Sequence, residues 1–137
     1  MQEDLFLNVL APALIPFLVG ILANLIEGLA EKFSMRRRAL RVAWDSAVLG
    51  VGLSGGVFSD MRVIQHYQPQ GIGTAEFLCI LPQLFCLIFM AYLRRENPEA
   101  GWKPTACLVL GGIALLLPVW LHAHALGWHW NLYGISL

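Results

Sequence analysis

Three strongly polar residues interrupt the apolar stretches of this sequence. Asn24 and Glu27 lie toward the end of the first stretch, and Asp45 lies near the start of the second. Polar groups at membrane depth are costly, and they usually mark an ion path or a polar cavity. Carboxylates repeated around an assembly form rings that favour cations. Asn24, Glu27 and Asp45 are therefore candidates for the inner mouth of a cation-favouring pore or polar cavity.

The same carboxylates also have a structural interpretation. Arg41 precedes Asp45 by one helical turn, so the two side chains can pair on one helix face. Glu27 can lie at the inner headgroup level, because the first helix is longer than the hydrocarbon core. In that case both carboxylates are interfacial groups held near arginines.

Histidines gather after the last apolar stretch, at His122, His124 and His129. Clustered imidazoles can bind zinc or copper, or they can sense pH. The spacing is poor for a metal site, because His122 and His124 point to different faces of a helix. We expect amphipathic side chains at the outer interface, and the sequence leaves metal binding and pH sensing open.

Motifs of common catalytic sites are absent from the sequence. It has no Walker-type glycine loop, HExxH, CxxC or nucleophile elbow. Its three cysteines lie in apolar stretches, which argues against a disulfide framework. The net charge is zero, so no overall field attracts nucleic acid. We expect no enzymatic activity, no cofactor and no nucleic-acid partner, and we assign no metal ligand.

Four apolar stretches can supply helices to position these groups. The chain is 58% hydrophobic and only 13% charged, well below the charge of a soluble domain. A helix needs about 20 apolar residues to cross a bilayer. The expected fold is an all-α integral membrane protein, a small helical bundle in one membrane domain over residues 1–137, with an outer loop over 60–75. Its transmembrane helices are predicted at about 5–29, 40–58, 74–93 and 104–124.

The basic residues predict how these helices cross the membrane. Eight of the nine Lys and Arg follow the first or the third stretch: Lys32, Arg36, Arg37, Arg38, Arg41, Arg94, Arg95 and Lys103. Because cytoplasmic segments are rich in Lys and Arg, both groups are expected inside, with the two termini outside. This arrangement requires the short second stretch to cross, despite Asp45. All five tryptophans then fall at membrane boundaries, where amphipathic rings are favoured. We expect the protein in the bacterial inner (plasma) membrane.

Small residues recur along the second helix. Ser46, Gly50 and Ser54 are spaced by four, and Gly52 and Gly56 form a second such pair. Small residues allow helix backbones to approach closely in lipid. They predict either packing inside one bundle or an interface between subunits. Since four short helices enclose little space, we expect association with further copies or with a partner membrane subunit.

The preferred hypothesis is a small polytopic protein that oligomerises to form or gate a pore or channel, of the holin-like or membrane-effector type. The alternative is a non-catalytic accessory subunit that binds a partner through the second helix and the basic loop. Arg36, Arg37, Arg38 and Arg41 of that loop are candidate contacts for anionic lipid or for an acidic cytoplasmic partner. No motif selects between these functions.

Overall fold

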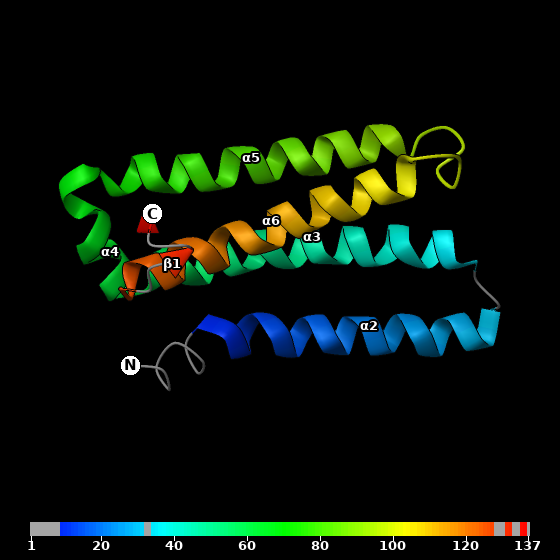
Figure 1. Ribbon diagram of the computed structural model, residues 1–137, viewed down its shortest axis with the longest axis horizontal. Helices are drawn as coiled ribbons and strands as arrows, with labels where there is room; N and C mark the ends of the chain where they lie inside the picture. Colours follow the sequence, from blue (N-terminus) through cyan, green and yellow to red (C-terminus); the bar gives the residue numbers. More distant parts are fainter. Residues whose placement is uncertain (1–8, 32–33, 128–130, 133–134, 137) are drawn as a thin grey trace.

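The computed structural model describes residues 9–31, 34–127, 131–132 and 135–136. Within these ranges the chain forms the α-helices α2 (Ala11–Glu31), α3 (Met35–Ser59), α4 (Met61–Tyr67), α5 (Ile72–Leu93) and α6 (Lys103–Ala125), and the 3-10 helix η2 (Gln68–Gln70) (Figure 1). The short strands β1 (Asn131–Leu132) and β2 (Ile135–Ser136) pair antiparallel. The predicted all-α helical bundle is confirmed.

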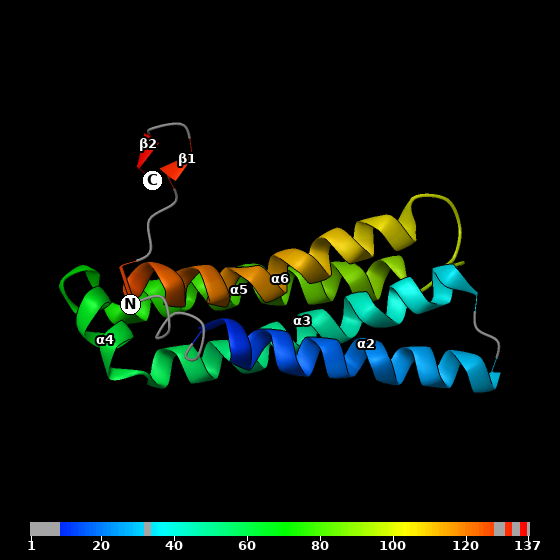
Figure 2. The same ribbon diagram turned by 60° about the horizontal axis from the view of Figure 1, so that its bottom comes forward.

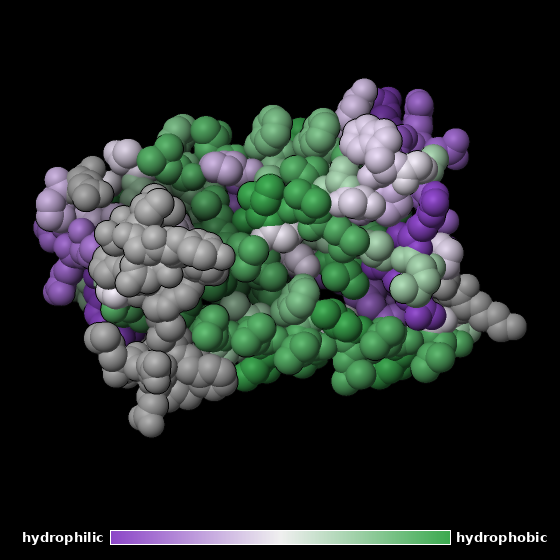
Figure 3. All heavy atoms as spheres, viewed as in Figure 1, coloured by the Kyte–Doolittle hydropathy of each residue, from purple (hydrophilic) through white to green (hydrophobic). Residues whose placement is uncertain are grey.

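Four of the described helices, α2, α3, α5 and α6, are long and apolar enough to cross a membrane. They run alternately up and down, so α2 begins and α6 ends at the same end of the bundle (Figure 1). A broad apolar surface separates two polar ends (Figure 3), and large side chains such as Ile15, Leu29 and Ile88 are exposed on it. These features are those of an integral membrane protein.

We name the two ends of the bundle by the distribution of positive charge. The inner end carries the start of α3 and the loop between α5 and α6, where Arg36, Arg37, Arg38, Arg41, Arg94, Arg95 and Lys103 lie. The outer end carries α4 (Figure 1). These names follow the positive-inside rule and are used below.

The basic segment after α2 is itself helical. α3 begins at Met35, earlier than the predicted residue 40, because the Ser34 hydroxyl accepts a hydrogen bond from the backbone N–H of Arg37 at 3.2 Å and caps the helix. Arginine is a good helix former. The predicted start at residue 40 was taken from the beginning of the apolar stretch. The polar first turn of α3 precedes that stretch, so the prediction missed it.

The predicted outer loop is largely helical, and this part of the prediction was wrong. Asp60 ends α3, and its carboxylate accepts a hydrogen bond from the Arg62 N–H at 2.9 Å to cap α4. Val63 and Tyr67 of α4 are buried against the bundle. Gly71, with φ of +88°, then turns the chain into α5. The Asp60 cap and the burial of Val63 and Tyr67 against the bundle are enough to stabilise this short helix.

α3 and α6 approach each other most closely, through reciprocal glycines. Gly50 of α3 lies against the backbone carbonyl of Ala114, and Gly111 of α6 lies against the carbonyl of Ala43. A methyl group at either glycine would overlap that carbonyl, so the approach requires glycine. α5 packs on both helices and completes a three-helix core.

α2 lies at the edge of this core. Among the described helices it packs mainly on α3, and both views show the two side by side (Figures 1 and 2). Most of its surface carries exposed apolar side chains, which are Leu14, Ile15, Leu18, Val19, Leu22, Leu25, Ile26 and Leu29. Because it has few helical neighbours, α2 is the membrane-spanning helix that is held least firmly.

Candidate functional site

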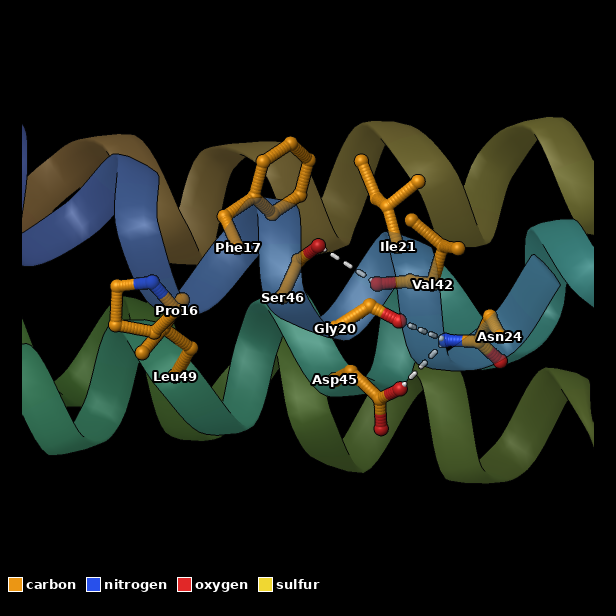
Figure 4. Close-up of a pocket in the computed structure, with 9 residues that line it drawn as sticks. All are labelled: Pro16, Phe17, Gly20, Ile21, Asn24, Val42, Asp45, Ser46 and Leu49. Atoms are coloured by element: carbon orange, nitrogen blue, oxygen red, sulfur yellow. Dashed lines mark hydrogen bonds between the residues drawn. The ribbon is translucent and has the colours of Figure 1, made fainter. Parts of the chain in front are cut away.

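Asn24 and Asp45 meet between α2 and α3, in a contact that we call the α2–α3 seam. The Asn24 amide donates one hydrogen bond to Asp45 Oδ2 and another to the carbonyl of Gly20, each at 3.0 Å (Figure 4). Asn24 is buried, with 7% of its surface exposed. Two candidate residues that are 21 positions apart therefore form one polar group between two candidate membrane spans.

Glu27, the third candidate, lies about one turn closer to the inner end. Its carboxylate forms an ion pair across the seam with Arg41. Both side chains are about half exposed, at 54% for Glu27 and 40% for Arg41, so the pair contributes little to stability. The seam thus carries two polar contacts in succession, an exposed ion pair and then a deeper amide–carboxylate pair.

A cavity of about 80 Å³ opens beside Asn24 and Asp45. Its volume admits several water molecules. The polar groups lie toward the inner end, and the lining becomes apolar toward the middle of the membrane. The cavity is lined by Pro16, Phe17, Gly20, Ile21, Asn24, Val42, Asp45, Ser46 and Leu49 (Figure 4).

Asp45 is exposed, although Asn24 binds one of its oxygens. It lies one helical turn, about 6 Å, further along α3 than Arg41. A carboxylate that faced hydrocarbon at this depth would be expensive. Asp45 lies within the candidate membrane span Met35–Ser59, where water or a polar group from another chain would stabilise its open side.

The candidate interface residues of α3 divide between two faces. Ser46, Gly50 and Ser54 are buried and pack against helices of the same chain. Gly52 and Gly56 are exposed, and a Cβ built on either meets nothing within 4 Å. The first face holds the bundle together, and the second leaves open space beside α3.

The candidate arginines Arg36, Arg37, Arg38 and Arg41 lie in the first two turns of α3. The Arg36 guanidinium donates to the backbone carbonyl of Glu99 at 2.7 Å, and the Ser34 hydroxyl donates to the Glu99 carboxylate at 3.1 Å. Arg38 lies against Gly28 of α2. The α5–α6 loop therefore joins the start of α3, and the two basic segments form one inner surface.

At the outer end, Asp60 and His122 form a contact that the sequence did not predict. His122 Nε2 lies 3.0 Å from Asp60 Oδ2, and Arg62 Nη2 donates to the same oxygen at 2.9 Å. The hydrogen bonds from the Arg62 side chain hold the pKa of Asp60 well below its usual range. The Arg62 N–H and His122 act in the same direction, and burial opposes them. Asp60 and His122 are 62 positions apart, so their spacing carries no signal.

The remaining histidines have different neighbours. His124 lies against His66 and against Trp120, with ring centroids 5.5 Å apart in both contacts. His129 lies outside the described residues. In the part of the chain that the structure describes, no group of three or more His, Cys, Asp or Glu side chains could hold a metal ion. The three cysteines are free and buried.

Gln83 is a further buried polar residue that the sequence analysis did not single out. Its amide donates to the carbonyl of Ala114 at 2.9 Å, and its Oε1 accepts from the Ser54 hydroxyl at 2.8 Å. Pro118 follows Ala114 by one turn and has no N–H, so it leaves that carbonyl without its helical donor. A glutamine in one apolar stretch and a proline in another are the signals that could have indicated this contact.

The fold and the seam define a small polytopic membrane protein with a polar contact inside its inner half. The chain matches no family model, no curated protein and no solved structure to which it was compared. Its function must therefore be inferred from its own residues.

Proposed function

We propose that this protein associates with further copies of itself to form a cation-favouring pore in the bacterial inner membrane. Asn24, Glu27 and Asp45 form the inner mouth of this pore. The observation that carries the proposal is the position of Asp45, which Asn24 binds on one side while its other side is open within a candidate membrane span. A carboxylate in such a position attracts cations and excludes anions.

Association of copies is supported by the open face of α3. Gly52 presents no side chain there, so the backbone of a neighbouring helix can approach closely. A neighbouring copy would also shield Asp45 from hydrocarbon. The basic inner surface suits the anionic headgroups of the cytoplasmic leaflet. We propose no enzymatic role and no cofactor.

Potassium efflux from liposomes that contain the purified protein tests the proposal. We expect potassium to leave faster than chloride, because carboxylates line the mouth. Asp45→Asn should lower potassium efflux by about tenfold, since it removes a charge that attracts the ion at short range. Glu27→Gln should have a smaller effect, because Glu27 is more exposed and already paired with Arg41.

Glu96→Gln is the matched control, because Glu96 is an exposed carboxylate at the same end of the bundle and outside the seam. Its potassium efflux should equal that of the unaltered protein. Absence of efflux, together with a stable monomer in detergent, would contradict the pore. The open face of α3 and the basic inner surface would then favour an accessory subunit that binds a different membrane protein.

A further inference from the structure

A second cavity continues the α2–α3 seam toward the outer end. Its volume is about 200 Å³. Pro12 of α2, Leu53 and Gly56 of α3, and His122 of α6 contribute to its lining. His122 in turn contacts Asp60, which lies between α3 and α4. This cavity therefore connects the apolar middle of the seam with a polar contact at the outer end.

The two cavities follow one another along the same pair of helices. On α2, Pro16 lines the inner cavity and Pro12 lines the outer one. On α3, Leu49 lines the inner cavity and Leu53 the outer one. On each helix these residues are one turn apart, which is a rise of about 6 Å. A single helical turn thus separates two spaces that together extend from Asp45 to His122.

The turn between the cavities combines apolar side chains with an irregular helix. Leu49 and Leu53 present only hydrocarbon. Across the seam, Pro16 has no N–H, so the carbonyl of Pro12 lacks its usual helical donor. A backbone carbonyl without a helical partner can replace part of the water around a cation. Pro16 also loosens the outer half of α2, and among the four long helices α2 has the fewest helical neighbours.

We infer that a cation path runs along the α2–α3 seam inside each chain. Cations enter from the inner end at Asn24 and Asp45 and leave at the outer end past His122 and Asp60. The path is closed at the turn from Leu49 to Leu53, and a displacement of α2 from α3 opens it. Arg62 binds Asp60 and offsets its negative charge at the outer end of the path. The inference rests on the proposed cation conduction and places the path within a chain, with a neighbouring copy covering the open side of the seam.

Filling the outer cavity with a side chain tests this location. Gly56 lines that cavity, and a Cβ at Gly56 meets nothing within 4 Å, so a leucine there starts from open space beside the cavity. Gly20 lines the inner cavity and has equal room. Gly56→Leu and Gly20→Leu should each lower potassium efflux from liposomes by about tenfold or more, because conduction fails when its path is blocked.

Gly112→Leu is the matched control. Gly112 is a helical glycine of α6 with nothing within 4 Å of its Cβ, and it lines neither cavity. Its efflux should equal that of the unaltered protein. If Gly56→Leu and Gly20→Leu conduct normally while Asp45→Asn is impaired, ions pass between copies and the inference is wrong, although the proposed function stands. If the unaltered protein does not conduct, the proposed function itself fails.

A thiol introduced at Leu53 separates blockage from misfolding. Leu53→Cys is reconstituted first and then treated with a positively charged methanethiosulfonate, so the protein is already folded when the label is added. The unaltered chain, whose three cysteines are buried, receives the same treatment. We expect potassium efflux to fall only in Leu53→Cys. Complete labelling with unchanged efflux would overturn the proposed path.

Discussion

Gln83 shows how one side chain can repair a helix that proline has interrupted. Pro118 removes the donor that the carbonyl of Ala114 would receive within α6. Gly50 brings the α3 backbone against the same carbonyl, and Gln83 supplies the missing hydrogen bond from α5. Gln83 is fully buried, so water cannot take its place. The contact therefore links the three core helices at one point.

Replacing Gln83 with leucine keeps the volume of the side chain and removes its hydrogen bonds. We expect Gln83→Leu to destabilise the folded protein by about 1–2 kcal/mol, because it leaves the Ala114 carbonyl unpaired in an apolar core. Unfolding in mixed micelles with increasing denaturing detergent measures this change.

A second substitution identifies the cause of the destabilisation. Pro118→Ala restores the N–H that can bind Ala114 within α6. In a Pro118→Ala background, Gln83→Leu should therefore cost less than it does alone, which a double-mutant cycle measures. Equal costs in both backgrounds would show that Gln83 does not act through the Ala114 carbonyl.

At the scale of elements, α3 organises the bundle because its faces carry different small residues. On the buried face, Gly50 lies against α6 and Ser54 against α5, while Ser46 lines the cavity beside α2. The face with Gly52 is open. Both repeats have the same spacing in the sequence, and only the positions of the neighbouring helices distinguish them.

Alanine at Gly50 and at Gly52 should have opposite effects on stability. Gly50→Ala places a methyl group into the Ala114 carbonyl, so we expect a loss of about 1–3 kcal/mol or more. Gly52→Ala meets no atom of its own chain and improves helix propensity, so for the single chain in detergent we expect no loss and a gain of up to about 1 kcal/mol. Thermal unfolding in detergent compares them, and equal losses would contradict the two-face description.

At the scale of the whole molecule, both ends of the bundle are polar and only one is strongly basic. The inner end gathers the arginines of α3 and the basic α5–α6 loop, which Ser34, Arg36 and Glu99 hold together. Among the residues that the structure describes, Arg62 is the one Lys or Arg at the outer end, and it is bound to Asp60. This difference predicts the orientation of the protein in the membrane.

Thiol labelling of intact bacteria tests that orientation. Gln65 of α4 and Glu96 of the α5–α6 loop are both exposed, and the native cysteines are buried. Gln65→Cys should react with a membrane-impermeant maleimide in intact cells, whereas Glu96→Cys should react only after the membrane is opened. The reverse pattern would place the basic end outside and refute the assignment of inner and outer ends.

The candidate site was only partly predictable from the sequence. Asn24, Glu27 and Asp45 were recognisable because polar side chains are rare in membrane-spanning stretches. Their partners were not predictable. Asn24 and Asp45 lie on different helices, and no local sequence pattern indicates how two helices are rotated relative to each other. The Asp60–His122 contact and the role of Gln83 depend on helix packing in the same way.

The sequence by itself determined the class of this protein. The lengths of its apolar stretches predict four membrane-spanning helices, and its arginines predict their direction, because both properties depend on transfer of single residues into lipid. Only the tertiary structure decided which small residues hold the bundle together and which remain open. The contacts of Asp45 with Asn24 and of His122 with Asp60 are also visible only in the tertiary structure. They depend on the distances between α2, α3 and α6 and on the rotation of each helix about its axis.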